Sequence, residues 1–143
     1  MVQKEVARRM TASPGSKEYG ALTVAVQFYS DASIEFRVPP SAFMPRPKVE
    51  SAVVKLKVAA QPRARVDDTA LFFKVVRLAF QHRRKTLANA LSMGFGRDRE
   101  EISLALAGLG IHPGRRGETL SILEFASVSN SLRVAILENE NYT

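Results

Sequence analysis

The sequence predicts a short α/β segment followed by an all-α segment, in a chain of 143 residues. Apolar and polar residues alternate along 32–38 and again along 52–58, which is typical of strands with one buried face. The next stretch, "AAQPRARV", has the composition of a linker, and beyond it apolar residues recur at helical spacing. We therefore predict a first domain at 1–60, a linker at 61–66 and a helical domain at 67–143.

The first 30 residues contain one clear helix and one ambiguous run. "QKEVARRMTA" has helix-forming composition and is ended by "SPGS". In "ALTVAVQFYS", Leu22, Val26 and Tyr29 fit a helical stripe, but the β-branched content fits a strand equally well.

The two strand-like runs are expected to pair as antiparallel neighbours. In the first, we expect Phe36 to share the buried face with Ile34; in the second, Lys55 and Lys57 occupy the face opposite to the apolar residues. The connection reads "PPSAFMPRPKVE" and contains four prolines. Proline fixes φ and restricts the residue before it, so this connection should hold Phe43 and Met44 in a stiff, nearly extended backbone.

Four short helices are expected after the linker. Asp67 or Asp68 caps the first, and we expect the second to run through "RRKTLANALS". Two capping boxes predict the starts of the third and fourth helices, Asp98 with Glu101 and Ser121 with Glu124. Gly108 or Gly110 ends the third.

Positive charge is concentrated in the helical segment. The net charge is +7, which favours an anionic partner, with nucleic acid ahead of a membrane surface. Seven bases stand between positions 74 and 99 against one acid, whereas three Arg face six Glu from 100 to the end. The densest run is Arg83, Arg84 and Lys85, which could spread across RNA phosphates near a helix end. Such runs are more often solvated turns, and composition alone leaves the two readings about even.

Phe43 also has two readings. It could fill a gap between a strand and a helix, or it could present a rigid ring against which an unpaired base stacks. A rigid mount favours stacking, because a mobile ring would lose binding free energy when it became ordered.

Several other classes of site are disfavoured. The chain has no Cys, and His82 and His112 are isolated, so a metal site is not expected. We find no glycine-rich phosphate loop and no Ser-His-Asp arrangement. No apolar run approaches the roughly 20 residues of a membrane span, and the N-terminus does not resemble a secretory signal. The cytoplasm is therefore the expected compartment.

At this point five stretches, in order, show a family resemblance: "QKEVARRM", "SKEYGALTVAVQFYSDA", "VPPSAFMPRPKVESAVVKL", "AFQHRRKTLANAL" and "GIHPGRRGETLSILEFA". Together they resemble the C-terminal half of the bacterial 16S ribosomal RNA adenine dimethyltransferase family. The resemblance implies methyl transfer from S-adenosylmethionine to the N6 atoms of two adjacent adenines near the 3′ end of 16S rRNA. It also implies that 1–60 is the C-terminal part of a Rossmann-like methyltransferase domain and that 67–143 is a helical rRNA-binding domain.

The resemblance assigns roles to matching positions. Phe43 corresponds to the aromatic residue that stacks on the target adenine. The basic run Arg83, Arg84 and Lys85 corresponds to a cluster that grips rRNA, and Arg116 and Arg9 match further arginines associated with rRNA contact. The family's glycine-rich cofactor loop and its Asn-Leu-Pro-Tyr motif are absent from this sequence. We therefore expect the chain to bind no S-adenosylmethionine and to be inactive alone.

The expected partner is 16S rRNA or the small ribosomal subunit, and no membrane is expected. The alternative function is a non-enzymatic RNA- or ribosome-binding module, which an upstream reading frame encoding the missing motifs would exclude. Without the early strands, an unpaired sheet edge would remain, so either a disordered N-terminal segment or self-association through that edge is also expected.

Overall fold

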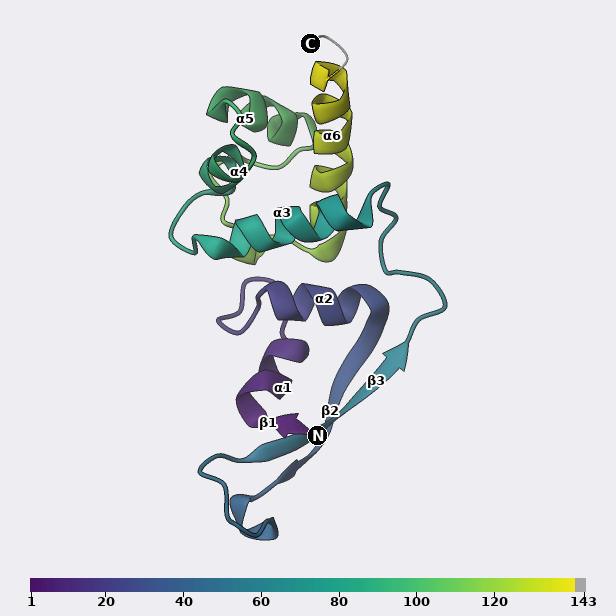
Figure 1. Cartoon of the computed structure of the whole chain (residues 1–143), viewed down its shortest axis with the longest axis vertical. Coiled ribbons are helices and arrows are strands. Elements are labelled where there is room, and N and C mark those ends of the chain that lie inside the picture. The colour runs from purple at the N-terminus through teal and green to yellow at the C-terminus, as the bar shows by residue number, and fades with distance from the viewer. Residues whose placement is uncertain (141–143) are drawn as a thin grey trace. The chain divides into compact units, whose positions relative to one another are not determined.

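The computed structural model describes residues 1–140, except for the side chains of 139 and 140 (Figure 1). The chain divides into two compact units, Met1–Arg63 and Ala64–Thr143. Residues 141–143 of the helical domain predicted from the sequence lie outside the described part.

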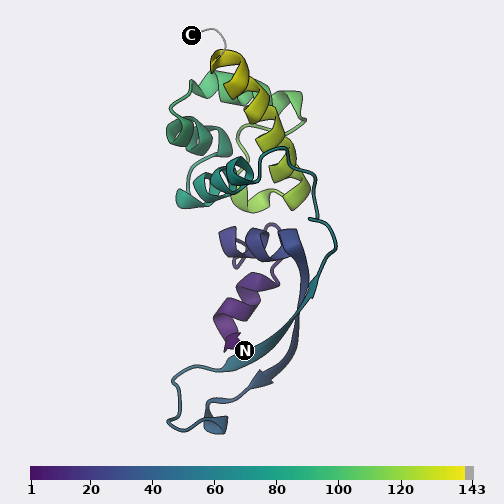
Figure 2. The same ribbon diagram turned by 45° about the vertical axis from the view of Figure 1, so that its right-hand side comes forward.

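The first unit is a small antiparallel sheet with two helices. In chain order its elements are β1 (Val2–Gln3), α1 (Lys4–Met10), α2 (Ala21–Tyr29), β2 (Ser30–Val38), the 3-10 helix η1 (Pro40–Ala42) and β3 (Ser51–Val58). The strand order is β1-β3-β2, and both pairings are antiparallel, which confirms the predicted pairing of the two long strands. Figure 2 shows β2 and β3 as one long twisted ribbon that carries η1 at its end.

The run "ALTVAVQFYS", which the sequence left ambiguous, forms helix α2, but the face that it buries differs from the predicted helical stripe. Leu22 and Tyr29 are largely exposed, whereas Thr23, Val24 and Phe28 are buried. The Thr23 hydroxyl accepts a hydrogen bond from the Gly20 amide and donates one to a carbonyl of α1. This polar contact rotates the buried face of α2 away from the side that hydrophobicity alone suggests.

A β-bulge interrupts the expected alternation of buried and exposed residues in β2. Ile34 lies opposite Val54, but Phe36 lies opposite Val53, so two residues of β2 occupy the place of one in β3. Because residues directly opposite each other share a face, the bulge moves Phe36 to the side of the sheet that carries Lys55 and Lys57. Its side chain is 58% exposed, so the prediction that it shares a buried face with Ile34 was wrong.

The first unit ends at a residue that is tied to the end of α2. The Arg63 amide donates to the Phe28 carbonyl at 2.8 Å, and its Nε donates to the Gln27 carbonyl at 2.9 Å. Its guanidinium also pairs with Asp31. These bonds satisfy carbonyl groups that a helix leaves without partners at its C-terminus.

The second unit is a bundle of four helices around one core. Its elements are α3 (Thr69–Gln81), α4 (Leu87–Phe95), α5 (Arg99–Gly108), the 3-10 helix η2 (Gly117–Thr119) and α6 (Ile122–Glu140). The largest fully buried side chains of this core are Phe72, Val75, Val76, Leu87, Leu91, Leu106, Leu120, Phe125 and Val128. Within the described residues, no helix has the length and apolar character needed to span a bilayer.

The predicted helix caps are mostly confirmed. Asp68 accepts the Leu71 amide at 3.0 Å. Asp98 caps the third helix as predicted, but it accepts the Glu100 amide at 2.8 Å, not that of Glu101, whose carboxylate pairs with Arg97. Ser121 and Glu124 form both bonds of a capping box, each at 3.1 Å. The third helix ends at Gly108, and Gly110 follows in a left-handed conformation with φ of 76°.

Two glycines let backbone segments pack closely against α3. A Cβ atom at Gly94 of α4 would lie 2.4 Å from the Leu78 side chain. A Cβ atom at Gly117 of η2 would lie 2.7 Å from the Ala79 Cβ and 3.0 Å from the Ala79 carbonyl oxygen. Both α4 and η2 therefore contact α3 at distances that no other residue type permits without displacement.

Candidate nucleic-acid interface

The basic run lies in the turn between α3 and α4, and the prediction that it forms helix is wrong. Helix α3 ends at Gln81, the Lys85 amide donates to the His82 carbonyl at 3.0 Å, and α4 begins at Leu87. Thr86 is the cap of α4, with its hydroxyl accepting the Asn89 amide at 3.3 Å. A good N-cap residue directly after the basic run thus starts a new helix instead of continuing one.

All three cations of this turn are exposed. In a helix, the side chains of neighbouring residues would point about 100° apart. In this turn, each of the three side chains takes its own direction, and none of them is buried. The Lys85 Nζ atom lies 3.2 Å from the Sδ of Met93 on α4, which orients that side chain along the helix.

A second segment is held against this turn. The Leu87 amide donates to the Arg115 carbonyl at 2.7 Å, and the Ala88 amide donates to the Pro113 carbonyl at 3.4 Å. These amides belong to the first turn of α4, which has no carbonyl partners within its own helix. The structure therefore brings the segment 113–116 next to the basic turn, although it lies far along the chain from it.

The side chain of Arg115 fixes this segment to α6. Its Nη1 donates to Glu124 Oε2 at 2.5 Å and its Nη2 to Glu124 Oε1 at 3.2 Å, a two-bond arrangement. Its Nη2 also donates to the Thr119 carbonyl at 2.8 Å. The hydrogen bonds from Arg115 lower the pKa of Glu124, and those to Glu124 raise the pKa of Arg115. Sequence analysis missed Arg115, because its partners are set by packing and not by spacing.

Arg116, the next residue, is exposed. It precedes Gly117, whose close contact with Ala79 holds η2 against α3. Arg115 therefore has a structural role, while Arg116 presents a charge at the surface. Four predicted contact residues, Arg83, Arg84, Lys85 and Arg116, are consequently gathered in one unit by the α4 N-terminus; we call them the basic turn surface.

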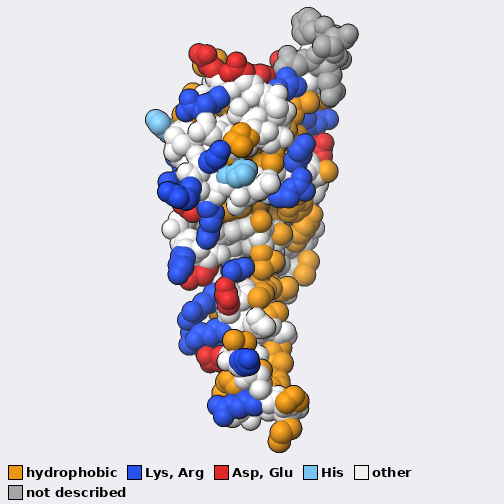
Figure 3. Space-filling view, turned by 60° about the vertical axis from the view of Figure 1, so that its left-hand side comes forward, with side chains coloured by type: hydrophobic (Ala, Val, Ile, Leu, Met, Phe, Trp, Pro, Cys, Tyr) orange, Lys and Arg blue, Asp and Glu red, His pale blue; other side chains and the backbone are white. Residues whose placement is uncertain are grey.

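On the side of the helical unit drawn in Figure 3, Lys and Arg side chains surround a group of apolar and His side chains. Isolated positive charges favour solubility, but a face on which they gather attracts a polyanion. The surface therefore has the electrostatic character that phosphate contacts require.

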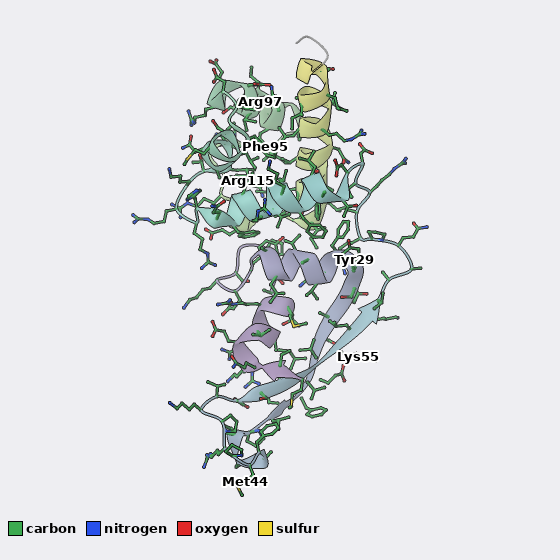
Figure 4. All side chains as sticks on the ribbon, viewed as in Figure 1. Tyr29, Met44, Lys55, Phe95, Arg97 and Arg115 are labelled. Atoms are coloured by element: carbon green, nitrogen blue, oxygen red, sulfur yellow. The ribbon has the colours of Figure 1, made fainter. Side chains whose placement is uncertain are left out.

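Phe43 is mounted between β2 and β3 as the sequence predicts. It follows η1, its amide donates to the Pro40 carbonyl at 3.2 Å, and its backbone is extended with φ of −119° and ψ of 150°. Its side chain is half-buried, whereas the neighbouring Met44 is 98% exposed, as Figure 4 shows at the tip of the connection. The ring is therefore partly supported by its own unit and partly accessible.

Arg9 lies on the last turn of α1, and the structure does not bring it next to Phe43. Its Nη2 donates to Glu5 Oε1 at 2.7 Å, four residues earlier on the same helix. The connection that carries Phe43 instead meets the other end of α1, where Lys4 and Glu50 pair at 3.1 Å. Both Arg9 and Glu5 are largely exposed, so this pair is weak enough to be exchanged for a phosphate.

Neither histidine belongs to a metal-binding arrangement. The His112 Nδ1 accepts the Gly114 amide at 2.9 Å, and the His82 carbonyl closes the basic turn. The described residues contain no group of three or more His, Asp or Glu side chains that could hold a metal ion.

Among the described residues, no strand leads through a glycine turn into a helix, the arrangement that binds a dinucleotide in Rossmann folds. In β1, Gln3 is followed directly by the first residue of α1, with no glycine turn between strand and helix. The glycines with positive φ are Gly15, Gly96 and Gly110, and none of them follows a strand.

Comparison with known proteins gives a consistent result. The pattern that defines the family described as "Ribosomal RNA adenine dimethylase" matches residues 1–133. The ribosomal RNA small subunit methyltransferase A of Geobacillus kaustophilus is 52% identical over 135 residues, which cover 92% of this chain and 46% of that protein. The protein of the same name from Halothermothrix orenii is 49% identical over 142 residues, with 98% and 47% covered. The chain thus spans about half the length of the curated relatives it matches.

Two solved structures are similar in fold. A dimethyladenosine transferase from Plasmodium falciparum superimposes with a TM-score of 0.69 at 23% identity, covering 88% of this chain and 53% of that one. The 23S rRNA methyltransferase ErmE superimposes with a TM-score of 0.61, also at 23% identity, covering 92% and 52%. At this identity the superpositions establish a shared fold.

Proposed function

The chain belongs to the ribosomal RNA adenine dimethylase family, and we propose that it is the half of such an enzyme that docks RNA and supports the target base. Its unit Met1–Arg63 would be the C-terminal part of a Rossmann-like methyltransferase domain, and the helical unit would be the rRNA-binding domain. The substrate would be two adjacent adenines near the 3′ end of 16S rRNA in the small ribosomal subunit.

One observation carries the RNA-docking proposal. The bond from the Leu87 amide to the Arg115 carbonyl joins the residue before Arg116 to the start of α4, which supports the proposal that Arg116 and the basic turn bind RNA together. Contacts of Arg and Lys to phosphates fix the position of a protein on RNA and release counterions. Such contacts read no base sequence, so they suit a surface whose role is to position the substrate.

The support for base stacking comes from the mount of Phe43. Its extended backbone, the preceding 3-10 turn and its partial burial restrict the ring before any base arrives. A base stacked on an aromatic side chain contributes roughly 1–3 kcal/mol to binding. A restricted ring keeps most of that contribution, because it gives up little further side-chain entropy when the base binds.

S-adenosylmethionine, the methyl donor that the family implies, does not fit the residues present here. No strand of the described part leads through a glycine turn into a helix. We propose that the donor binds to a part of the enzyme outside these 143 residues and that this chain alone transfers no methyl groups. Calorimetry with S-adenosylmethionine should show no binding, and methyl transfer from labelled donor to small subunits by the chain alone would refute this statement.

RNA docking is tested through the salt dependence of binding. We expect R83A/R84A/K85A to weaken binding to bacterial small ribosomal subunits and to reduce the slope of log K against log salt by up to about three units. The matched control, R83K/R84K, keeps every charge and should keep the slope. A slope unchanged in the triple variant would show that the turn is only solvated.

A further inference from the structure

The exposed side of α3 carries a second row of positive charge that leads into the basic turn. On this helix Lys74, Arg77 and Gln81 are exposed, whereas most of the remaining positions are buried or half-buried. Their spacing of three and four residues places them on one face. We propose that this face, here called the α3 row, binds phosphates of the same RNA that the basic turn surface holds. This inference rests on the proposed function and extends its site.

The cations of the α3 row have no carboxylate partner among the described residues. Helix α3 contains no Asp or Glu, and neither Lys74 nor Arg77 takes part in the ion pairs that Lys4, Arg9, Arg63, Arg97 and Arg115 form. A cation that is already paired must give up its partner before it can bind a phosphate. Because Lys74 and Arg77 have no carboxylate partner in the described part of the chain to give up, each can contribute its full charge to phosphate binding and to counterion release.

The ammonium group of Lys74 is also held in place by a contact with a neighbouring helix. Its Nζ lies 4.9 Å from the centroid of the Phe95 ring on α4, within the range of a cation–π contact. Helix α4 can approach this closely because Gly94 has no side chain to collide with Leu78. The contact restricts a flexible side chain at an exposed site but leaves the charge in place.

The length of the row fits a stretch of RNA backbone. From Lys74 to Gln81 the helix rises about 10 Å, and the basic turn follows directly. A strand of a nucleic acid duplex carries about one phosphate per 3.4 Å of helix axis, so the α3 row could face about three phosphates. Gln81, which is neutral, would add hydrogen-bond donors and acceptors between the two groups of cations.

RNA fits this face better than a membrane or an acidic peptide does. Its exposed positions are Ala70, Lys74, Arg77 and Gln81, without a large apolar side chain. A helix that inserts into a bilayer surface needs bulky apolar residues beside its cations, and peptide recognition likewise relies on apolar anchors. Phosphates need only charge and hydrogen-bond donors.

The test compares three variants of the full chain in binding to a transcript of the 3′ region of bacterial 16S rRNA over a series of KCl concentrations. K74Q/R77Q should reduce the slope of log K against log salt by about 1.5 units, because each phosphate left without its cation lowers the slope by about 0.7 to 0.9. K74R/R77K keeps both charges and should keep the slope. F95L removes the ring beneath Lys74 and should also keep the slope, because the charge itself binds the phosphate.

The outcomes separate this inference from the proposed function. If K74Q/R77Q keeps the wild-type slope while R83A/R84A/K85A reduces it, the α3 row is not part of the RNA surface and the proposed docking function stands. If neither variant changes the slope, both proposals are wrong. If the double variant fails to fold by circular dichroism, K74Q and R77Q are measured singly. Each should then reduce the slope by about 0.8, and an unchanged slope in both would overturn the inference.

Discussion

The amide of Leu87 donates a 2.7 Å hydrogen bond to the carbonyl of Arg115, and this bond joins the start of α4 to the loop before η2. The loop is held in turn by the side chain of Arg115, which binds Glu124 at the start of α6. The position of the basic turn relative to Arg116 therefore depends on a backbone hydrogen bond in which none of the charged side chains of this surface takes part.

We expect R115A to weaken this connection between the start of α4 and the loop before η2, here called the joint, without removing a cation from the basic turn surface. The Leu87 amide should exchange with solvent about fivefold faster, as expected for a loss of about 1 kcal/mol from a partly exposed pair. Hydrogen exchange followed by NMR measures this directly. R116A is the matched control, because the exposed Arg116 side chain holds no part of the joint, and equal exchange rates in the two variants would contradict the role of Arg115.

The Arg115–Glu124 pair should also make folding stability depend on pH. Arg115 lowers the pKa of Glu124 below its ordinary value of 4.5, so the unfolded chain binds more protons in that range. The pair's contribution is then fully present above pH 4.5 and disappears as pH falls through the lower folded-state pKa. In E124Q, the loss of stability on acidification below pH 4.5 should be smaller, measured by urea unfolding at several pH values. R115A should likewise reduce the dependence of unfolding free energy on pH below pH 4.5. A wild-type dependence in both variants would contradict this role of the pair.

Gly117 should tolerate no side chain. In G117A the new Cβ would lie 2.7 Å from that of Ala79 and 3.0 Å from its backbone oxygen, and α3 cannot yield without disturbing the core. We expect a loss of about 1–3 kcal/mol in unfolding free energy. G108A is the control, since a Cβ there meets nothing within 4 Å and should be neutral or stabilising by up to about 1 kcal/mol. Similar stabilities of the two variants would show that η2 shifts freely.

Phe43 should contribute to binding only when a base is available to stack on it. F43L keeps an apolar side chain but removes the flat ring, so affinity for a hairpin transcript of the 16S rRNA 3′ region should fall by about 1–3 kcal/mol. On a transcript with abasic sites at the two target adenines, wild type and F43L should bind alike. An equal loss on both transcripts would indicate that Phe43 supports the fold instead.

Self-association through the sheet stays a prediction that the structure makes more specific. Strand β2 is an edge strand of nine residues, and Phe36 and Val58 are 58% and 76% exposed. An exposed edge beside apolar side chains invites pairing with another chain. Light scattering should show a mass that rises with protein concentration, and F36T/V58T should reduce it. A constant monomer mass for the unmodified chain would exclude this expectation.

Local signals in the sequence predicted the elements whose causes are local. The caps at Asp68, Asp98 and Ser121 depend on a side chain and an amide two or three residues later, so their spacing is visible in the sequence. The two long strands were visible because one face of each repeats with period two. Strand β1 was not predicted, because it is two residues long and exists through pairing with β3, which lies far away in the sequence.

The candidate site was visible in part for the same reason. A run such as Arg83–Lys85 can be found in the sequence, and so can a proline-rich mount around Phe43. The helix break before Leu87 was missed, since helix-forming composition continues through it and Thr86 decides the new start. The joint at Arg115 could not be found, because its partners lie on separate segments that only packing brings together.

The extra residue in β2 has a consequence for sequence change in this region. Loss of one codon, that for Glu35, would remove the bulge and make Ile34 and Phe36 consecutive residues, still opposite Val54 and Val53, so Phe36 would stay on the side of Lys55. A three-nucleotide deletion at this position would thus make the strand regular without changing the side on which any other residue of β2 lies.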